Sequence, residues 1–274
     1  MSLVLVKSFG VVSVVGMPQA ALRRFGVPVG GAFDSESLAL ASALAGPDSG
    51  ETSWELSMAQ ASFRAKRARV VTVVGAIAVV RLRGESLETS TAFSVTEGDE
   101  FLVEVPSDGA RVYVAYGSSA RQVNWRLRLE EPPESVANRR VLRVVAGPQA
   151  SSFLDFVLET EFTVSRIGNR VGVRLEPPIG AHRIELPSEP QCVGTIQVSN
   201  DGTPILLGPD GPTIGGYPKI AVVATCDLPR IGQLAPGDAV RFEIVSIEDA
   251  RQLLQEAKLR LERRLRLLKL STTL

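Results

Sequence analysis

A loop rich in glycine and proline, residues 208–218, constrains the fold of this chain more than any other stretch. It separates two short apolar runs, 204–207 and 220–224, whose aliphatic residues are typical of β-strands. A plain hairpin reverses direction in about two to five residues, so a longer loop of this composition has a defined shape of its own. Glycine permits positive φ and close approach of another backbone, whereas proline fixes φ. We therefore predict a rigid rim between two strands. Polar side chains presented there include Thr213 and Tyr217, with Lys219 directly after the loop.

The composition is typical of a soluble globular protein. The 274 residues are 45% hydrophobic, which is enough for the core of one large domain or two small ones. Thirty basic and thirty acidic residues cancel, so the charge balance favours neither nucleic acid nor an anionic membrane as a partner. The longest apolar run, 70–80, contains Gly75 and is too short to span a bilayer, so it indicates strand–turn–strand or one buried strand. We expect a cytoplasmic protein.

Cysteine and histidine are scarce. Cys192 and Cys226 are too few for a disulfide scaffold, and without a nearby histidine they do not make a zinc site. We expect buried thiols and no metal site. His182 is the only histidine, so a Ser-His-Asp or Cys-His arrangement would need this one residue, and we favour an ordinary turn or surface position for it.

The N-terminal part consists of short apolar pieces that are rich in β-branched residues and bounded by Gly, Pro, Asp or Ser. Such pieces predict strands of a mainly antiparallel barrel or sandwich. They are Leu3 to Val6, Val11 to Val15, Ala68 to Val74, Ala78 to Leu82, Phe101 to Val105 and Arg111 to Tyr116.

Two segments are predicted to be helical. Residues 34–45 have few β-branched residues, begin at Asp34 as N-cap and end at Gly46. Residues 247–270 lack Gly and Pro, and leucines and alanine recur on one face at spacings of three and four. The opposite face is basic. Docking on its own domain and binding to a partner or a second copy both explain this last helix, and membrane-surface binding is a more distant alternative.

The chain shows signs of two related halves. The segment 130–134 is rich in Glu and Pro and is the best candidate for a linker. Gly98-Asp99 leads into one alternating apolar strand and Gly237-Asp238 leads into another, so the two pairs resemble equivalent turns in two subdomains.

Eight separate blocks of the sequence form one ordered set. The blocks are GVPVGGAFDSESLALASALAG (26–46), WEL (54–56), VVAGPQASSF (144–153), NRVGVRLE (169–176), GTIQV (194–198), GGYPKIA (215–221), DLPR (227–230) and PGDAVRF (236–242). They resemble the carboxyltransferase-like family, which includes the C subunit of 5-oxoprolinase, allophanate hydrolase subunit 2 and the matching domain of urea amidolyase and urea carboxylase. The resemblance covers most of residues 1–247 in the family's order.

The resemblance implies a mainly β fold with two β-barrel-like subdomains, the second cyclophilin-like, and a few short helices. We place the N-terminal β subdomain at residues 1–135, the C-terminal one at 136–247 and the amphipathic helix at 248–274.

The candidate site residues are Lys219, residues of the loop before it, three acidic residues and Gln197. Lys219 supplies a cation for a carboxylate or an oxyanion, and we expect it to be exposed. Asp34 and Asp227 are the other candidate catalytic residues, as bases or as groups that orient the lysine. The candidate substrate-binding residues are Thr213, Gly215, Gly216, Tyr217, Gln197 and Glu55. Each acid also has a structural explanation: a helix cap for Asp34, a strand-edge charge for Glu55 and a turn position for Asp227.

The chain departs from the family pattern in three places. Residues 15–21 replace a QD-x-GR-x-G motif, Asn169 stands where the family has an acid, and residues 117–140 replace a longer glycine-rich segment. Loss or drift of activity is therefore one interpretation.

Two functions follow from the resemblance. The first is a subunit of an ATP-dependent amide or lactam hydrolase or carboxyltransferase complex, acting on 5-oxoproline or a urea-like small molecule with a companion carboxyltransferase-like subunit and a lactam-hydrolysing subunit. ATP would bind to a partner, because the loop does not fit the P-loop pattern. Biotin enters only if the carboxyltransferase interpretation holds. The alternative is a diverged, non-catalytic binding module of the kinase-inhibitor antagonist type.

Overall fold

The computed structural model describes residues 2–46, 49, 52–118, 127–129, 131, 133–180 and 186–271. The chain forms two compact units, each built from separate stretches of sequence. Unit 1 comprises Met1–Met17, Asp34–Ala137 and Arg260–Leu274, and unit 2 comprises Pro18–Phe33 and Asn138–Leu259. The sequence predicts subdomain boundaries after residues 135 and 247. Independent folding of the contiguous segments 1–135 and 136–247 stays a prediction.

Unit 1 is a nine-stranded sheet in the part of the chain that the structure describes. Its order is β5-β4-β7-β2-β8-β3-β6-β9, and β1 pairs with β2 along the outer edge. The strands are β1 (Leu3–Val15), β2 (Ser53–Ala65), β3 (Arg69–Ile77), β4 (Val79–Leu82), β5 (Glu85–Glu88), β6 (Thr91–Val95), β7 (Glu100–Val103), β8 (Asp108–Ser118) and β9 (Leu127–Arg128).

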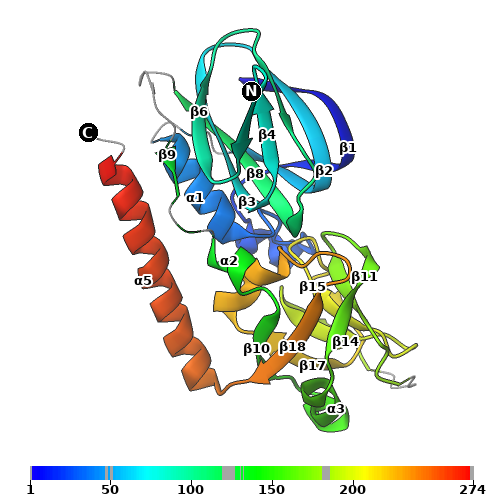
Figure 1. Ribbon diagram of the computed structural model, residues 1–274. Coiled ribbons are helices and arrows are strands. Elements are labelled where there is room, and N and C mark those ends of the chain that lie inside the picture. Colours follow the sequence, from blue (N-terminus) through cyan, green and yellow to red (C-terminus); the bar gives the residue numbers. More distant parts are fainter. Residues whose placement is uncertain are drawn as a thin grey trace. The chain divides into compact units, whose positions relative to one another are not determined.

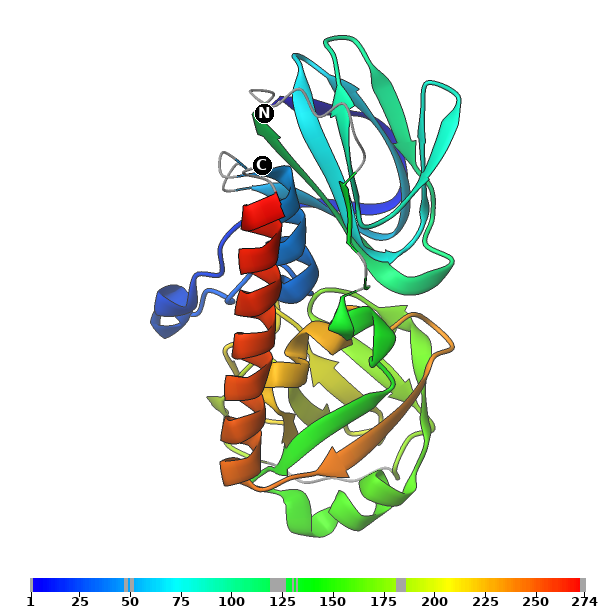
Figure 2. The same cartoon turned by 60° about the vertical axis from the view of Figure 1, so that its left-hand side comes forward.

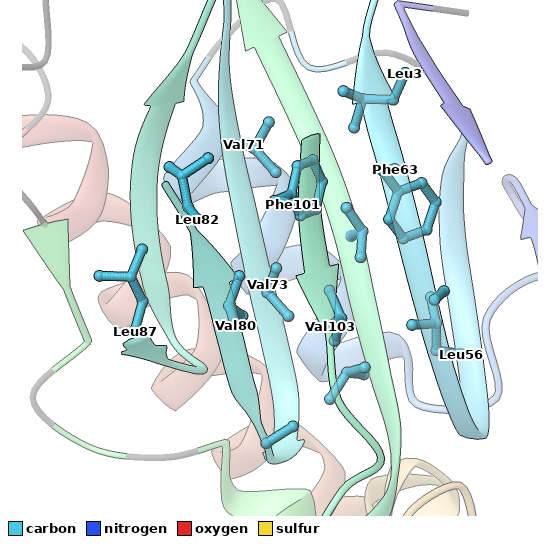
Figure 3. Packing of buried hydrophobic residues seen from close by; sticks show 14 of the residues in the cluster. Leu3, Leu56, Phe63, Val71, Val73, Val80, Leu82, Leu87, Phe101 and Val103 are labelled. Carbon is cyan, nitrogen blue, oxygen red and sulfur yellow. The ribbon is translucent and has the colours of Figure 1, made fainter. Parts of the chain in front are cut away.

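The core of unit 1 is lined by alternate side chains of these strands. Phe63 on β2 stacks on Phe101 of β7, with ring centroids 5.3 Å apart. Figure 3 shows both rings among leucine and valine side chains, including Leu56 and Val103 of the same two strands and Val71 of β3. Because side chains of a strand alternate between its two faces, this apolar set occupies one face of the strands.

The N-terminal apolar pieces form one strand rather than two. β1 pairs with β2 over its whole length, and its register shifts between Leu5 and Lys7 and between Phe9 and Val11. Gly10 lies in the second shift with φ +88°, and a Cβ there would lie 2.7 Å from the carbonyl oxygen of Met58. The bulge interrupts the alternation, which explains why the sequence suggests two strands.

Unit 2 is a closed barrel in the order β10-β17-β14-β15-β12-β11-β18. Its strands are β10 (Val141–Ala146), β11 (Phe162–Gly168), β12 (Gly172–Glu176), β14 (Thr195–Val198), β15 (Pro204–Leu207), β17 (Lys219–Val223) and β18 (Ala239–Ile244). β10 and β18 are distant in sequence but pair in parallel, and Figure 2 shows the green and orange strands side by side. The predicted rim does separate two strands, β15 and β17, and both pair with β14.

A small second sheet accompanies the barrel. β13 (Glu189–Pro190) pairs with β16 (Ile214–Gly215), which lies inside the predicted rim. The short helices of unit 2 are η1 (Ala20–Phe25), η2 (Ala150–Ser152), α3 (Leu154–Glu159), η3 (Thr225–Asp227) and α4 (Leu228–Ile231).

The other helices of the described residues are α1 (Ser35–Ala45), α2 (Glu134–Ala137) and α5 (Ile247–Ser271). α1 begins where the sequence predicts, because the side chain of Asp34 accepts the backbone N–H of Ser37 at 3.0 Å. α5 is continuous, and Figure 1 shows it as one long ribbon. None of the helices within the described residues is both long and apolar enough to cross a membrane.

The predicted fold class is confirmed: the chain is mainly β, with a nine-stranded sheet in one unit, a closed barrel in the other, few short helices and a C-terminal helix. The apolar run 70–80 is strand–turn–strand, since β3 ends at Ile77 and β4 begins at Val79. The expectation of buried thiols is wrong for Cys192, which is exposed, whereas Cys226 is partly buried.

Candidate functional site

Lys219 occupies the first position of β17, and its backbone is held on both sides. Its N–H donates to Oε1 of Gln149 at 2.9 Å, and its carbonyl accepts the N–H of Gln149 at 3.1 Å. Its Cα lies opposite that of Gln197 on β14. The expectation of an exposed lysine is wrong, because Lys219 is 6% exposed. Its ammonium lies against Glu189 of the small second sheet instead of reaching solvent.

The ammonium of Lys219 lies against one carboxylate. Its Nζ is 2.6 Å from Oε2 of Glu189 on β13. The contact is a charge pair outside hydrogen-bond geometry, and Nζ has no aligned hydrogen-bond partner among the described residues. The two side chains differ in burial: Lys219 is 7% exposed and Glu189 is 38% exposed. A buried cation is therefore paired with a carboxylate that reaches solvent.

Two buried amides lie beside this pair. Nε2 of Gln191 donates to Oε1 of Gln197 at 3.1 Å. Oε1 of Gln191 is buried and finds no partner in the part of the chain that the structure describes. A buried acceptor without a donor costs about 1–3 kcal/mol, so such an atom marks a position where a ligand donor would be favoured.

Glycines permit close approach of the chain around these residues. A Cβ on Gly147 would lie 2.3 Å from the carbonyl oxygen of Lys219, and a Cβ on Gly215 would lie 2.5 Å from Nε2 of Gln191. A Cβ on Gly216 would lie 3.0 Å from the carbonyl oxygen of Leu186. The glycines of the loop thus serve close packing, as the sequence predicts for Gly215 and Gly216.

The segment before Gln191 is tied to the barrel by backbone groups. The N–H of Gln191 donates to the carbonyl of Thr213 at 2.9 Å, which extends the β13–β16 ladder. The guanidinium of Arg23 on η1 donates to the carbonyl of Gln191. These contacts fix the chain from which Glu189 and Gln191 project.

Asp227 forms a separate ion pair at the opposite end of β17. Its Oδ2 accepts the backbone N–H of Arg143 at 2.9 Å and the Nε of Arg143 at 2.8 Å, and Nε of Arg230 lies 3.3 Å from Oδ1. The carboxylate is fully buried. Asp227 is therefore more than the turn residue suggested by the sequence, because it joins β10 to the η3–α4 segment. Its catalytic role stays a prediction.

The other two acids belong to a buried network in unit 1. Asp34 accepts the hydroxyls of Ser37 at 2.6 Å and Ser135 at 2.7 Å, and its backbone N–H donates to Oη of Tyr113 at 2.7 Å. Oη of Tyr113 donates to Oε2 of Glu55 at 2.8 Å. Burial, Glu55 and Asp34 raise the pKa of Tyr113 well above its usual range, so the phenol stays a donor.

Glu55 is not a strand-edge charge, because it is 1% exposed on β2 between β1 and β8. Its Oε1 lies 3.7 Å from Nε of Arg111. The neighbouring Glu36 is also enclosed, and burial first and Asp34 second raise its pKa. Asp34 and Glu55 thus share a network through Tyr113, and their roles in catalysis and substrate binding stay predictions.

The structure brings only part of the predicted set together. Lys219, Gln197 and Gly215 form one cluster with Glu189 and Gln191, which we call the Lys219 cluster. Thr213 joins it through its backbone, whereas Tyr217 is 39% exposed. His182 lies outside the described residues. Sequence reasoning missed Gln149, Glu189, Gln191 and Arg23; the GPQ triplet after β10 is the one signal in the family blocks that contains any of them.

Asn169, which departs from the family pattern, still forms the hydrogen bonds of a turn. Oδ1 of Asn169 accepts the N–H of Val171 at 2.8 Å and that of Gly172 at 3.4 Å. An aspartate would accept the same two bonds. Arg170 pairs with Asp210, at 2.7 Å between Nε and Oδ2. The asparagine therefore preserves the turn that positions this arginine.

Solved structures share the fold. The crystal structure of the K. lactis urea amidolyase matches 96% of this chain with a TM-score of 0.80 at 20% identity, over 20% of that chain. The Kluyveromyces lactis urea carboxylase matches 95% of this chain with a TM-score of 0.79 at 21% identity, over 29% of that chain. The chain therefore has the fold of a segment that lies within these much longer proteins.

The family follows from the sequence model. The carboxyltransferase domain, subdomain A and B, matches residues 25–123 and 116–244, so the chain belongs to this family. It is 24% identical to the C subunit of the Escherichia coli 5-oxoprolinase over 85% of this chain and 88% of that protein. It is also 24% identical to the Lachancea kluyveri urea amidolyase over 84% of this chain, but over only 16% of that protein. The resemblance inferred from the sequence is confirmed.

Proposed function

We propose that this chain is one subunit of an ATP-dependent complex that acts on a small amide, with an activity like that of a 5-oxoprolinase C subunit on 5-oxoproline. A urea-like small molecule is the alternative substrate, since its reaction also takes place at an amide-type carbonyl. Support comes from relatives named as C subunits of 5-oxoprolinase and as urea amidolyase. ATP would bind to a companion subunit, and biotin is required only for a carboxyl-transfer reaction.

One observation carries the proposal: a buried ammonium and a buried amide oxygen without aligned partners within the described residues belong to the same cluster. An amide substrate offers the complementary groups, an N–H donor and a carbonyl oxygen that becomes negative during attack. Lys219 would bind a negative oxygen of the substrate, either a carboxylate or the carbonyl oxygen that becomes negative during attack, and Gln191 would accept the N–H. Removing one such donor typically costs about 3 kcal/mol in the transition state.

The test is reconstitution with a companion carboxyltransferase-like subunit and a lactam-hydrolysing subunit. ATP-dependent cleavage of 5-oxoproline by the full set is the expected result, and Lys219→Met should reduce kcat by at least about a hundredfold. The matched control is Lys258→Met on the exposed side of α5, which should leave the rate unchanged. A full set without ATP-dependent turnover of 5-oxoproline or urea would refute the enzymatic proposal.

A second candidate is a non-catalytic binding module of the kinase-inhibitor antagonist type. The occupation of Lys219 by Glu189 favours it, because an enzyme site would keep the cation available to substrate. The replaced motif at residues 15–21 points the same way. The module would bind a companion protein with unchanged affinity when Lys219 is replaced, whereas the enzyme subunit would lose turnover.

A further inference from the structure

We propose that Glu189 fills a carboxylate-binding site centred on Lys219, and that a small carboxylate ligand binds there by displacing it. This deepens the proposed function, since it concerns the same cluster and identifies the group that a ligand must present. It also assigns to Glu189 a role as an internal competitor, which limits binding to ligands that carry their own negative charge.

Lys219 and Glu189 differ in how firmly the chain holds them. The backbone of Lys219 is fixed by Gln149 through its N–H and its carbonyl, and by pairing with β14. Glu189 begins a strand of two residues that pairs only with β16 among the described residues. Its side chain is 38% exposed, against 7% for Lys219. Glu189 can therefore leave toward solvent while the ammonium stays in place.

The ammonium of Lys219 is paired in charge but poorly hydrogen-bonded. Nζ of Lys219 is buried and lies 2.6 Å from Glu189, yet the pair lacks hydrogen-bond alignment. An ammonium has three donors and forms its strongest interactions when they point at carboxylate oxygens. Glu189 approaches from a strand that is anchored elsewhere, so it neutralises the charge without using the donors well. A free carboxylate has no such tether.

The amide oxygen of Gln191 is a second unsatisfied group of the Lys219 cluster. Oε1 of Gln191 is buried without a partner in the described part of the chain, and its Nε2 is already committed to Gln197. Side chains of Glu189 and Gln191 lie on the same side of an extended segment, because side chains alternate along it. A ligand with a carboxylate close to an amide N–H would satisfy both Lys219 and Gln191. A neutral amide would satisfy only the second.

A purely structural ion pair makes a different prediction. If Glu189 only holds β13 on the barrel, its removal leaves an unpaired buried cation that no solute repairs well. If the proposal holds, the space left by Glu189 is a carboxylate site, and a small carboxylate restores the pair. Restoration of stability by an added carboxylate distinguishes the two accounts.

The experiment uses the full chain and measures thermal stability and calorimetric binding with formate, acetate, 5-oxoproline and 2-pyrrolidone. Glu189→Ala should bind formate and acetate at least about tenfold more tightly than the unmodified chain, with a matching rise in Tm. 5-Oxoproline should bind both proteins and 2-pyrrolidone, which lacks the carboxylate, should bind neither. The double variant Glu189→Ala/Lys219→Met should lose the gain.

Two controls isolate the effect. Glu161→Ala removes an exposed partner of Arg241 and should give no carboxylate rescue. Chloride at equal ionic strength should not replace formate. Equal stabilisation by chloride, or no carboxylate-dependent change in Glu189→Ala, would overturn the proposal. If Glu189→Ala does not fold, Glu189→Gln is measured instead, and it should show a smaller gain for acetate; its absence would overturn the proposal equally.

Failure of this inference is distinguishable from failure of the proposed function. The binding measurement needs neither ATP nor a companion subunit. Carboxylate rescue without turnover by the reconstituted set would leave the site standing and refute the enzyme. Turnover without rescue would refute the role of Glu189 alone.

Discussion

Asp99 is an example of a single carboxylate whose ionisation stabilises a turn. The side chain of Arg83 donates to it, and the N–H of Thr96 donates at 2.6 Å. The hydrogen bond from Arg83 is the main cause that lowers the pKa of Asp99 from 3.8 to about 2. A carboxylate with a lowered pKa in the folded state stabilises the fold above its unfolded pKa, and this contribution is lost as pH falls through the folded value.

We therefore predict that Asp99→Asn lowers the free energy of unfolding by about 1 kcal/mol at pH 7, a modest value because both side chains reach solvent. The difference from the unmodified chain should shrink between pH 3.8 and about 2, where Asp99 becomes protonated. Urea unfolding at a series of pH values measures it. A difference that is constant across this range would contradict the assigned cause.

Gly10 is a residue at which both conformation and space require glycine. Its φ is +88° and a Cβ would lie 2.7 Å from the carbonyl oxygen of Met58. We predict that Gly10→Ala lowers the free energy of unfolding by about 2–4 kcal/mol. The matched control is Gly26→Ala, where φ is +79° but the described residues leave the Cβ position open. That variant should cost about 1 kcal/mol, and equal costs at both positions would show that backbone conformation alone matters.

At the residue scale, the sequence predicts roles that depend on neighbouring residues in the chain. It does not predict roles that depend on strand register. Asp34 is the N-cap of α1 because its own backbone and the next turn determine that role. The surroundings of Lys219 are set by its pairing with Gln197 and by the approach of Gly147 to its carbonyl, and both residues are distant in sequence. A rim rich in glycine therefore predicted close backbone contact correctly but not which side chain it would cover.

The last turns of α5 show an element held by charge as well as by its apolar face. Leu268 is buried, as the spacing of the leucines predicts, and the four other residues of that predicted face are half-buried. Arg264 donates to Glu36 at 3.2 Å and to the carbonyl of Glu131 at 2.9 Å. Arg260 pairs with Glu134 at 3.1 Å. The apolar face is thus covered within the chain, and self-association through the exposed side stays a prediction.

We predict that Arg264→Met destabilises the chain more at pH 7 than at pH 4. Burial raises the pKa of Glu36 above 4.5, and Arg264 opposes that rise. An ionised Glu36 is therefore a cost in the folded state that grows as pH rises above 4.5, and loss of Arg264 enlarges it. We expect a loss of about 1–2 kcal/mol at pH 7 from thermal unfolding. Arg266→Met, on the exposed side, is the control, and a pH-independent deficit in Arg264→Met would contradict the assignment.

At the element scale, α5 was predictable because its helical period runs unbroken, whereas β2 was not. β2 covers Ser53–Ala65, but the sequence indicates only its WEL triplet, as a family block, and predicts no strand there. Met58 has φ 46°, so the alternation of inward and outward side chains changes phase in the middle of the strand. Serine, glutamine and alanine also dilute its apolar signal.

At the scale of the whole molecule, one pattern in the sequence corresponds to one repeated geometry. Gly98 and Gly237 have φ of +87° and +90°. In each unit the following aspartate accepts a backbone N–H three residues earlier, from Thr96 at 2.6 Å and from Ala235 at 3.0 Å. Each glycine N–H also donates to a strand carbonyl, that of Ala65 or Val164, at 2.9 Å. The predicted equivalence of the two turns is confirmed.

The sequence does not show that the units exchange segments. Residues 18–33 belong to unit 2 although they precede most of unit 1. Arg170 donates to the carbonyl of Gly31 at 2.7 Å, and the N–H of Gly30 donates to the carbonyl of Pro209 at 2.9 Å. Phe33 is 5% exposed within the core of the barrel. No local pattern predicts such a return, because each contact joins residues more than a hundred positions apart.

The last prediction follows from this exchange. Phe33→Ala should lower the stability of unit 2 by about 3–5 kcal/mol, because it empties a buried position in the barrel. Hydrogen exchange should then show reduced protection in β10, β14 and β17, with the strands of unit 1 less affected. Phe93→Ala is the matched control, since Phe93 is 4% exposed in the core of unit 1 and should reverse the pattern. For the same reason a fragment of residues 136–247 should be less stable than one that also carries residues 18–33. Equal stability of the two fragments, together with unchanged exchange in Phe33→Ala, would restore the contiguous boundary after residue 135.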